Sequence, residues 1–268
     1  MSSVQISDSE YKLGKTLSSY TSLAVAFSGG IDSSLLAFMA NKYVKGNVLL
    51  INVFSPFSTE REAVFVEKWA REQNYQLEVI KLNPLESEQI KSNPKDRCYH
   101  CKKLIMSELL KIAAKHGISF VADGTNVDDL GDYRPGNKAS DELGIKHPFL
   151  DANITKKEIR EMAKEYNLEN WDRPSSACLA SRVPFDTPIE EANLRKIEKA
   201  EEYLHALGYM HCRVRMIGES AKIELPPAIV DEIMPLRHEV VEKFKAIGFK
   251  RVFLDLEGYK MGALNEGF

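Results

Sequence analysis

The sequence predicts an α/β fold, in which a doubly wound parallel sheet is followed by a smaller C-terminal α+β domain. Short apolar runs alternate with amphipathic stretches through the first part of the chain, as in βαβ units. A glycine-rich turn joins the first apolar run to the helix pattern that follows it. The segment V-P-F-D-T-P near 184–188 marks a hinge, so we expect domains over 1–184 and 185–268.

The first domain is predicted to contain strands and helices in near-regular alternation. The apolar runs are typical of buried parallel strands, and Gly117 ends the predicted helix 101–115. In chain order we expect strand 23–27, helix 32–43, strand 48–54, helix 59–73, strand 76–82, helix 101–115 and strand 119–123. Ligands of such sheets lie at the carboxyl ends of the strands, where this chain carries S-G-G and D-G-T-N.

The second domain is predicted to be a compact unit that mixes both element types. The expected elements are helix 189–207, strands around 213–216 and 221–225, helix 229–247 and strand 251–256. We expect this domain to bind substrate and to support oligomerisation.

Composition is that of a soluble globular protein. The chain has 268 residues, 44% of them hydrophobic and 28% charged, and its net charge is −3, which gives no general attraction to nucleic acid. The N-terminus lacks a signal-peptide layout, and the apolar run 48–54 is too short to span a membrane. We therefore expect a cytoplasmic protein without membrane or nucleic-acid partners, whose four cysteines are ligands, nucleophiles or core residues and not disulfides.

The turn S-G-G-I-D-S predicts a phosphate cradle. Gly29 and Gly30 allow close approach of the backbone, and the N–H groups of the helix start favour an anion. Ser28 and Ser33 add hydroxyl donors, and Asp32 could hold Mg²⁺. The turn is neither a Walker loop nor a dinucleotide fingerprint, and the alternative is an ordinary strand-turn-helix corner.

The loop after strand 119–123 supplies further nucleotide-binding candidates. Gly124, within D-G-T-N, could border a nucleotide, whereas Asp128 and Asp129 more often cap or solvate such a loop. Arg134 could neutralise a phosphate, or it is one of many surface arginines.

Three cysteines are candidate ligands. Cys98 and Cys101 form C-Y-H-C in a basic string at the predicted start of helix 101–115, a position that favours thiolates. With Cys178, 77 positions later, they could hold three irons of a [4Fe–4S] cluster. A zinc site completed by His100 or Cys212, or a redox pair, stays open on the residues alone.

The segment around C-R-V-R separates a core cysteine from two cations. A two-residue period places Cys212 with Val214 and Met216 on one face and the two arginines on the other. Arg213 and Arg215 would suit a phosphate, or they lie on a solvated strand face. Glu201 and Glu202, on the charged helix, would ordinarily be solvated.

These motifs together resemble one family within the N-type ATP pyrophosphatases. A-F-S-G-G-I-D-S-S, C-Y-H-C-K-K, D-G-T-N-V-D-D, D-Y-R-P-G, P-S-S-A-C-L-A-S-R and C-R-V-R are similar, in this order, to motifs of the LarE family of ATP-dependent sulfur transferases. The resemblance covers about residues 15–260 and implies the adenine nucleotide alpha hydrolase-like fold. Members thiolate pyridinium-3,5-biscarboxylic acid mononucleotide, a step towards the nickel-pincer nucleotide of lactate racemase.

The resemblance also implies roles for individual residues. The cradle would bind ATP phosphates, and the substrate's phosphate would be held by Ser181, Arg182, Arg213 and Arg215. Glu201 would lie near the substrate or its metal. Family members with a single cysteine, at the position of Cys178, sacrifice its sulfur and keep dehydroalanine. The chain resembles the other variant, in which a [4Fe–4S] cluster on Cys98, Cys101 and Cys178 carries a sulfide on its open iron.

The expected reaction has two stages. ATP-Mg²⁺ activates a ring carboxylate as an acyl-adenylate with release of pyrophosphate, and sulfide then displaces AMP to leave a thiocarboxylate. We expect a homo-oligomer that takes the mononucleotide and a sulfide or other sulfur donor. The alternatives are a tRNA thiolation enzyme, an ammonia-dependent amide synthetase with zinc at the thiols, and a nucleotide-binding sensor without chemistry.

Overall fold

The computed structural model describes residues 7–131, 135–173 and 177–260. They form two compact units. The first unit comprises 1–55, 60–83 and 96–176, and the second comprises 56–59, 84–95 and 177–268. The second unit thus includes two short segments from the first part of the chain.

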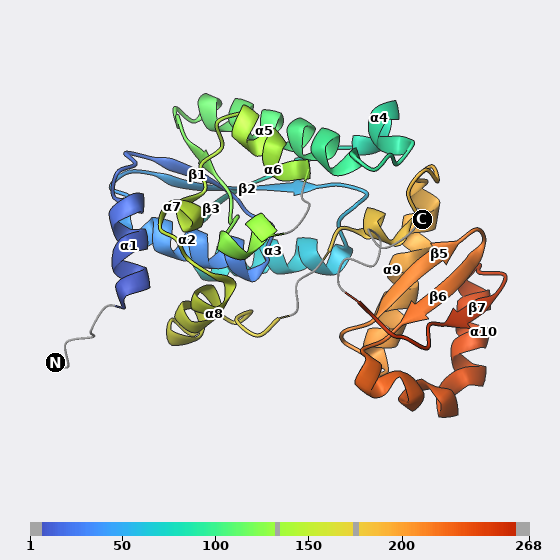
Figure 1. Cartoon of the computed structure of the whole chain (residues 1–268). Coiled ribbons are helices and arrows are strands. Elements are labelled where there is room, and N and C mark those ends of the chain that lie inside the picture. Colours follow the sequence, from blue (N-terminus) through green and yellow to red (C-terminus); the bar gives the residue numbers. More distant parts are fainter. Residues whose placement is uncertain (1–6, 132–134, 174–176, 261–268) are drawn as a thin grey trace. The chain divides into compact units, whose positions relative to one another are not determined.

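A four-stranded parallel sheet forms the centre of the first unit (Figure 1). Its strand order is β3-β2-β1-β4, with β1 at Leu23–Ala26, β2 at Val48–Phe54, β3 at Gln76–Lys81 and β4 at Val121–Ala122. The chain moves outward from β1 to β3 on one side and returns to β4 on the other, so the order reverses at β1 and β4. The predicted parallel α/β fold is confirmed.

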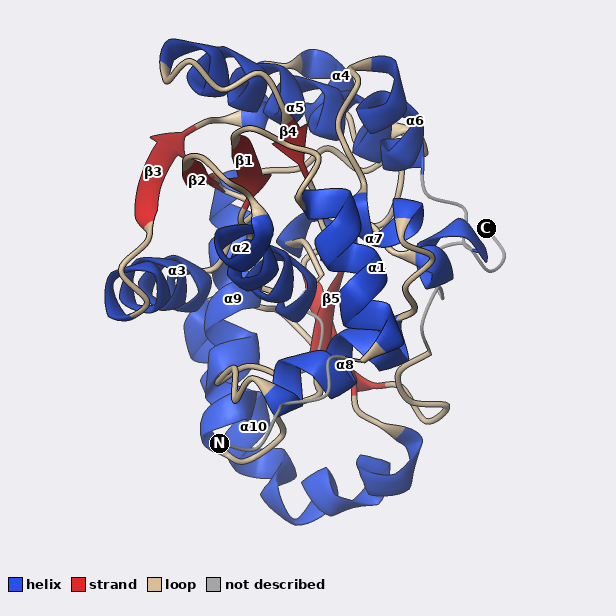
Figure 2. Cartoon of the chain, turned by 90° about the vertical axis from the view of Figure 1, so that its left-hand side faces the viewer, coloured by secondary structure: helices blue, strands red, loops and turns tan. Residues whose placement is uncertain are grey.

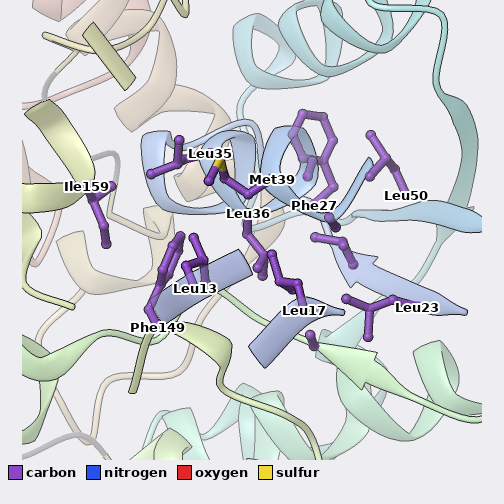
Figure 3. Packing of buried hydrophobic residues seen from close by; sticks show 14 of the residues in the cluster. Leu13, Leu17, Leu23, Phe27, Leu35, Leu36, Met39, Leu50, Phe149 and Ile159 are labelled. Carbon is purple, nitrogen blue, oxygen red and sulfur yellow. The ribbon is translucent and has the colours of Figure 1, made fainter. Parts of the chain in front are cut away.

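Both faces of this sheet are buried, as alternation along the strands shows. Leu23 and Val25 pack into one hydrophobic cluster, whereas Ala24 packs into another. One face is covered by α5 and the other by α1, α2, α3, α7 and α8 (Figures 1 and 2). Figure 3 shows Leu13 of α1 beside Phe149, within the same hydrophobic cluster as Leu17. The helices are α1 Asp8–Leu17, α2 Ile31–Tyr43, α3 Glu60–Glu72, α5 Arg97–Lys115, α6 Pro135–Glu142, α7 Pro148–Asp151 and α8 Lys156–Glu165, with a 3₁₀ turn at Val127–Gly131.

A three-stranded sheet of order β5-β6-β7 forms the second unit. Strand β5, Arg213–Ile217, is antiparallel to β6, Ser220–Glu224, which runs parallel to β7, Val252–Leu254. The unit's helices are α4 Glu88–Lys91, α9 Glu191–Ala206 and α10 Arg237–Ile247, with 3₁₀ segments at Pro84–Glu86, Leu179–Arg182 and Pro227–Leu236. The α+β character expected of the C-terminal part is confirmed.

Several elements differ from the sequence prediction. Helix α5 begins at Arg97, so the C-Y-H-C motif lies within the helix and not at its border. The single helix predicted over 229–247 is a 3₁₀ segment followed by α10, because Pro235 lacks an N–H and cannot continue a regular ladder. Helices α1, α6, α7 and α8 were not predicted. None of the helices in the described part of the chain is long and apolar enough to cross a membrane.

Candidate active site

The S-G-G turn connects β1 to α2 in a conformation that depends on glycine. Gly29 has φ +75°, and a Cβ there would lie 2.9 Å from Val66 Cγ2. Gly30 is the N-cap of α2 and makes no side-chain cap. The first-turn N–H groups of the helix are therefore not capped by that residue and are available to an anion. This geometry suits a phosphate cradle.

Two serines stabilise the cradle from within. Ser33 Oγ lies 3.2 Å from Ser28 Oγ, accepts from the Ser28 N–H at 3.2 Å and donates to the Gly30 carbonyl at 3.0 Å. Ser28 Oγ in turn accepts from the Gly30 N–H at 3.3 Å. Ser33 is buried, whereas Ser28 is exposed and can turn its hydroxyl to a ligand.

Strand β4 brings the D-G-T-N turn against the cradle. A Cβ on Gly124 would lie 2.8 Å from Asp32 Cβ and 3.2 Å from the Ser33 nitrogen. Only glycine allows this approach, because a side chain here would enter the first turn of α2. The two motifs are thus brought together at the carboxyl ends of neighbouring strands, as the sequence predicts.

Lys156, a residue that the sequence analysis missed, binds the candidate metal ligand of the cradle. Its Nζ lies 2.5 Å from both carboxylate oxygens of Asp32. It stands at the start of α8, where Thr155 and Glu158 form a capping box. The T-x-x-E spacing could have predicted this helix start, but no local pattern indicates a contact 124 positions away.

Asp123 is the centre of a buried ionic cluster beside the cradle. Its carboxylate contacts Lys102 Nζ at 2.7 Å and His147 Nδ1 at 2.7 Å, and it accepts from Thr125 Oγ1 at 2.7 Å. Burial alone would raise the pKa of Asp123, but Lys102 and His147 outweigh burial and hold that pKa well below its usual value. For His147, burial acts to lower the pKa and the contact with Asp123 raises it, with a net rise. The cluster therefore favours an anionic Asp123 and a protonated His147.

Asn170 holds the cradle from behind. Its Nδ2 donates to the Gly29 carbonyl at 3.0 Å and to Ser34 Oγ at 2.9 Å, and its side chain is buried. The first contact fixes the carbonyl of the residue with positive φ, which helps to maintain the orientation of the loop.

The C-Y-H-C thiols lie one helical turn apart on α5. Residues three apart share a helix face, so Cys98 and Cys101 can serve one ligand. Neither thiol forms a disulfide, Cys98 is exposed, and Arg97 Nη2 donates to Cys98 Sγ at 3.6 Å. Lys102, the next residue, contacts Asp123, so the helix that carries the thiols is tied to the cradle's neighbour.

Cys178 belongs to the second unit and precedes the 3₁₀ segment Leu179–Arg182. Its thiol is exposed and forms no disulfide. Arg182 and Glu201 are both buried and form a bidentate ion pair, with Nε to Oε1 at 2.9 Å and Nη2 to Oε2 at 3.0 Å. The expectation that glutamates of this helix are solvated is wrong for Glu201, because Arg182 and the Val214 N–H satisfy its carboxylate.

The period-two prediction for β5 is confirmed. Cys212, Val214 and Met216 are buried, and burial raises the pKa of the Cys212 thiol to about 12. Arg213 lies with its guanidinium carbon 5.4 Å from the centre of the Tyr259 ring. Arg215 donates to Glu224 at 2.7 Å and to the Ser181 carbonyl at 2.8 Å, which ties the strand to the turn after Cys178.

The described residues contain no group of three or more His, Cys, Asp or Glu side chains placed to hold a metal ion. The chemistry of the donor set still suits an iron–sulfur cluster, since Cys98, Cys101 and Cys178 form no disulfide and none is buried. Arg134 and the turn 174–176 lie outside the described residues.

Comparisons with known proteins cover almost the whole chain. The model of a family described as "Family of unknown function (DUF7411)" matches residues 21–165. The pyridinium-3,5-bisthiocarboxylic acid mononucleotide synthase of Lactiplantibacillus plantarum is 35% identical over 245 residues, 91% of this chain and 89% of that protein. The uncharacterized protein slr1717 of a Synechocystis species is 37% identical over 243 residues, 90% of this chain and 91% of its own. The uncharacterized protein MJ0830 of Methanocaldococcus jannaschii is 37% identical over 238 residues, 89% of this chain and 90% of its own.

Proposed function

The chain belongs to the LarE family, that of the pyridinium-3,5-bisthiocarboxylic acid mononucleotide synthase, and to the family of the matching model, and on this premise we propose that it is an ATP-dependent sulfur transferase. It activates the carboxylates of pyridinium-3,5-biscarboxylic acid mononucleotide with ATP and converts them to thiocarboxylates, for nickel-pincer nucleotide biosynthesis. The observation that carries the proposal is the glycine-dependent cradle at the carboxyl ends of β1 and β4, with a pair of thiols on α5, the helix that Lys102 links to Asp123 beside the cradle.

The cradle performs the first stage. The N–H groups at the start of α2 and the hydroxyls of Ser28 and Ser33 receive ATP phosphates, while Gly124 lets the nucleotide approach closely. Arg134 neutralises the adenylate phosphate. Asp32 would hold Mg²⁺, which would offset the charge of the phosphates, and Lys156, which contacts both carboxylate oxygens of Asp32, places a second cation beside that residue. The attacking substrate carboxylate is already anionic at neutral pH, so no base is needed.

Three thiols serve the second stage. Cys98, Cys101 and Cys178 hold a [4Fe–4S] cluster, which supplies the sulfide for transfer when it is bound. Cys212 takes no part, since its thiol is buried and its raised pKa disfavours a thiolate. The sulfide that enters the product replaces one carboxylate oxygen, which leaves with AMP.

The mononucleotide's phosphate is bound by Arg213 and Arg215 on β5 together with Ser181. Arg213 presents its guanidinium beside the Tyr259 ring. The carboxylate of Glu224 and the carbonyl of Ser181 fix Arg215 in orientation, which lowers the entropic cost of binding.

Exchange of labelled pyrophosphate into ATP tests the proposal. The protein should catalyse exchange only when the biscarboxylic acid mononucleotide is present, and anaerobic addition of sulfide should then yield the thiocarboxylate. Formation of an amide when ammonia replaces sulfide would assign the chain to amide synthesis. Thiolation of tRNA and not of the mononucleotide would assign it to tRNA modification.

A further inference from the structure

Cys178 lies on a short turn whose backbone is unusually well bound for an exposed residue. Its carbonyl oxygen accepts from the Ser181 N–H at 2.9 Å, from Ser181 Oγ at 2.8 Å and from Arg182 Nη1 at 3.1 Å. The Leu179 N–H donates to the Phe57 carbonyl at 3.1 Å. The thiol is exposed and forms no disulfide, whereas hydrogen bonds fix the backbone that carries it.

Arg182 is the residue that connects this turn to the interior of the second unit. Its Nη1 also donates to the Ala177 carbonyl at 2.7 Å, while Nε and Nη2 bind Glu201. The arginine is only 3% exposed. A planar guanidinium carries its donors on three nitrogens, so it can bind a carboxylate on one edge and carbonyls on another. The single nitrogen of an ammonium group cannot span both sites.

Glu201 is itself fixed from two elements. It is carried by α9, and its Oε1 accepts from the Val214 N–H of β5 at 2.9 Å. Glu201 of α9 therefore binds both β5 and Arg182, and Arg182 binds the Cys178 turn. Each of these contacts is a hydrogen bond that involves a charged group, and such bonds are stronger than those between neutral groups.

We propose that Arg182 and Glu201 are positioning residues, which hold the Cys178 turn in the geometry for sulfur transfer and do not contact the substrate. The role of Cys178 in sulfur transfer rests on the proposed function. The part of the proposal that concerns how Arg182 and Glu201 hold the turn does not. A phosphate could reach this guanidinium only by displacing contacts that Arg182 makes inside the unit. Buried ion pairs contribute more to defined geometry than to stability in some proteins, and this pair defines the geometry of an otherwise exposed turn.

Hydrogen exchange followed by mass spectrometry tests the proposal without any substrate. The informative variant is the double substitution Arg182→Met/Glu201→Leu, because it removes the ion pair without leaving an unpaired buried charge. We expect the amides of Leu179 and Ser181 to exchange about tenfold faster or more, while α9 and β5, apart from the Val214 amide that loses its acceptor, exchange as in the unaltered protein. The milder Arg182→Lys keeps the charge, loses the two-edged contact and should give the same local pattern.

Tyr209→Phe is the matched control. It also removes a donor to a backbone carbonyl of the same unit, the 2.9 Å bond to Glu232, and should leave exchange of the turn unchanged. Unchanged exchange in the turn of the double variant would overturn the proposal, and so would an increase that spreads equally over α9 and β5.

The kinetic measurement separates positioning from substrate contact. The double variant should keep its KM for the mononucleotide and its pyrophosphate exchange, while the rate of thiolation falls by about tenfold or more. A rise in KM that accounts for the whole loss would assign both residues to the substrate and overturn the proposal. If the unaltered protein does not thiolate the mononucleotide, the proposed function fails, and the exchange result still decides how the turn is held.

Discussion

At the scale of single residues, the carboxylate of Asp32 is the most demanding test of the cradle. Asp32→Asn removes a ligand that Mg²⁺ requires and should abolish pyrophosphate release, while thermal unfolding stays close to that of the unaltered protein. Asp8→Asn is the control for loss of one carboxylate charge, since Asp8 forms an exposed ion pair with Lys12. Normal pyrophosphate release by folded Asp32→Asn would remove this residue from the ATP site.

The four thiols divide into three that should matter and one that should not. Replacement of Cys98, Cys101 or Cys178 by Ala should each abolish cluster content and thiolation but leave adenylation, because none of these thiols belongs to the cradle. Cys212→Ala should keep both activities and lower the unfolding free energy by about 1 kcal/mol or more, through loss of a buried side chain. Iron and sulfide analysis after anaerobic purification, with pyrophosphate release in parallel, gives the comparison.

The two arginines of β5 should differ in their effect on stability. Arg213→Ala should weaken binding of the mononucleotide by about 1.5–3 kcal/mol with little effect on ATP, as for the loss of one charge-assisted contact. Arg215→Ala should weaken binding and also lower stability, because buried Glu224 loses the Arg215 Nε donor that contacts both its oxygens and keeps Lys222 as its cationic partner. Titration with each ligand and urea unfolding test both statements. Equal loss of ATP and mononucleotide affinity would place the arginines at the nucleotide.

At the scale of elements, the contact between the end of β4 and the start of α7 gives stability a pH dependence. The pKa of His147 is raised in the folded protein, so the contribution of its protonated form is complete below the unfolded pKa of about 6.5. That contribution is lost as pH rises through the higher folded pKa. The stability difference between the unaltered protein and His147→Gln should therefore shrink as pH rises from mildly acidic to alkaline.

Urea unfolding over this pH range measures the difference directly, and the imidazole titration followed by NMR gives the folded pKa. A difference that is constant with pH, or a titration midpoint below the unfolded value, would contradict the assignment. Asp123 acts at the acidic end, since its lowered pKa contributes stability that disappears only as pH falls through that low value.

At the scale of the whole molecule, local sequence patterns predict the strands, the turns at their ends and which strand face is buried. The S-G-G and D-G-T-N turns could be placed together because neighbouring parallel strands end at one edge of a sheet. The burial of Cys212 followed from the two-residue period of β5. The contacts of Lys156 with Asp32, Asn170 with Gly29 and Arg182 with Glu201 could not be predicted, because each joins residues that lie close only after folding. The sequence around a polar residue does not indicate which distant residue its side chain contacts in the folded protein.

The most direct test of the central claim is a single turnover under anaerobic conditions with ATP, sulfide and the biscarboxylic acid mononucleotide. Mass spectrometry of product and protein from the same reaction shows where the transferred sulfur came from. The account predicts a mononucleotide in which sulfur replaces carboxylate oxygen, with pyrophosphate and AMP released and the mass of the polypeptide unchanged. A polypeptide lighter by one H₂S, with dehydroalanine at position 178 and full activity of Cys98→Ala, would contradict it.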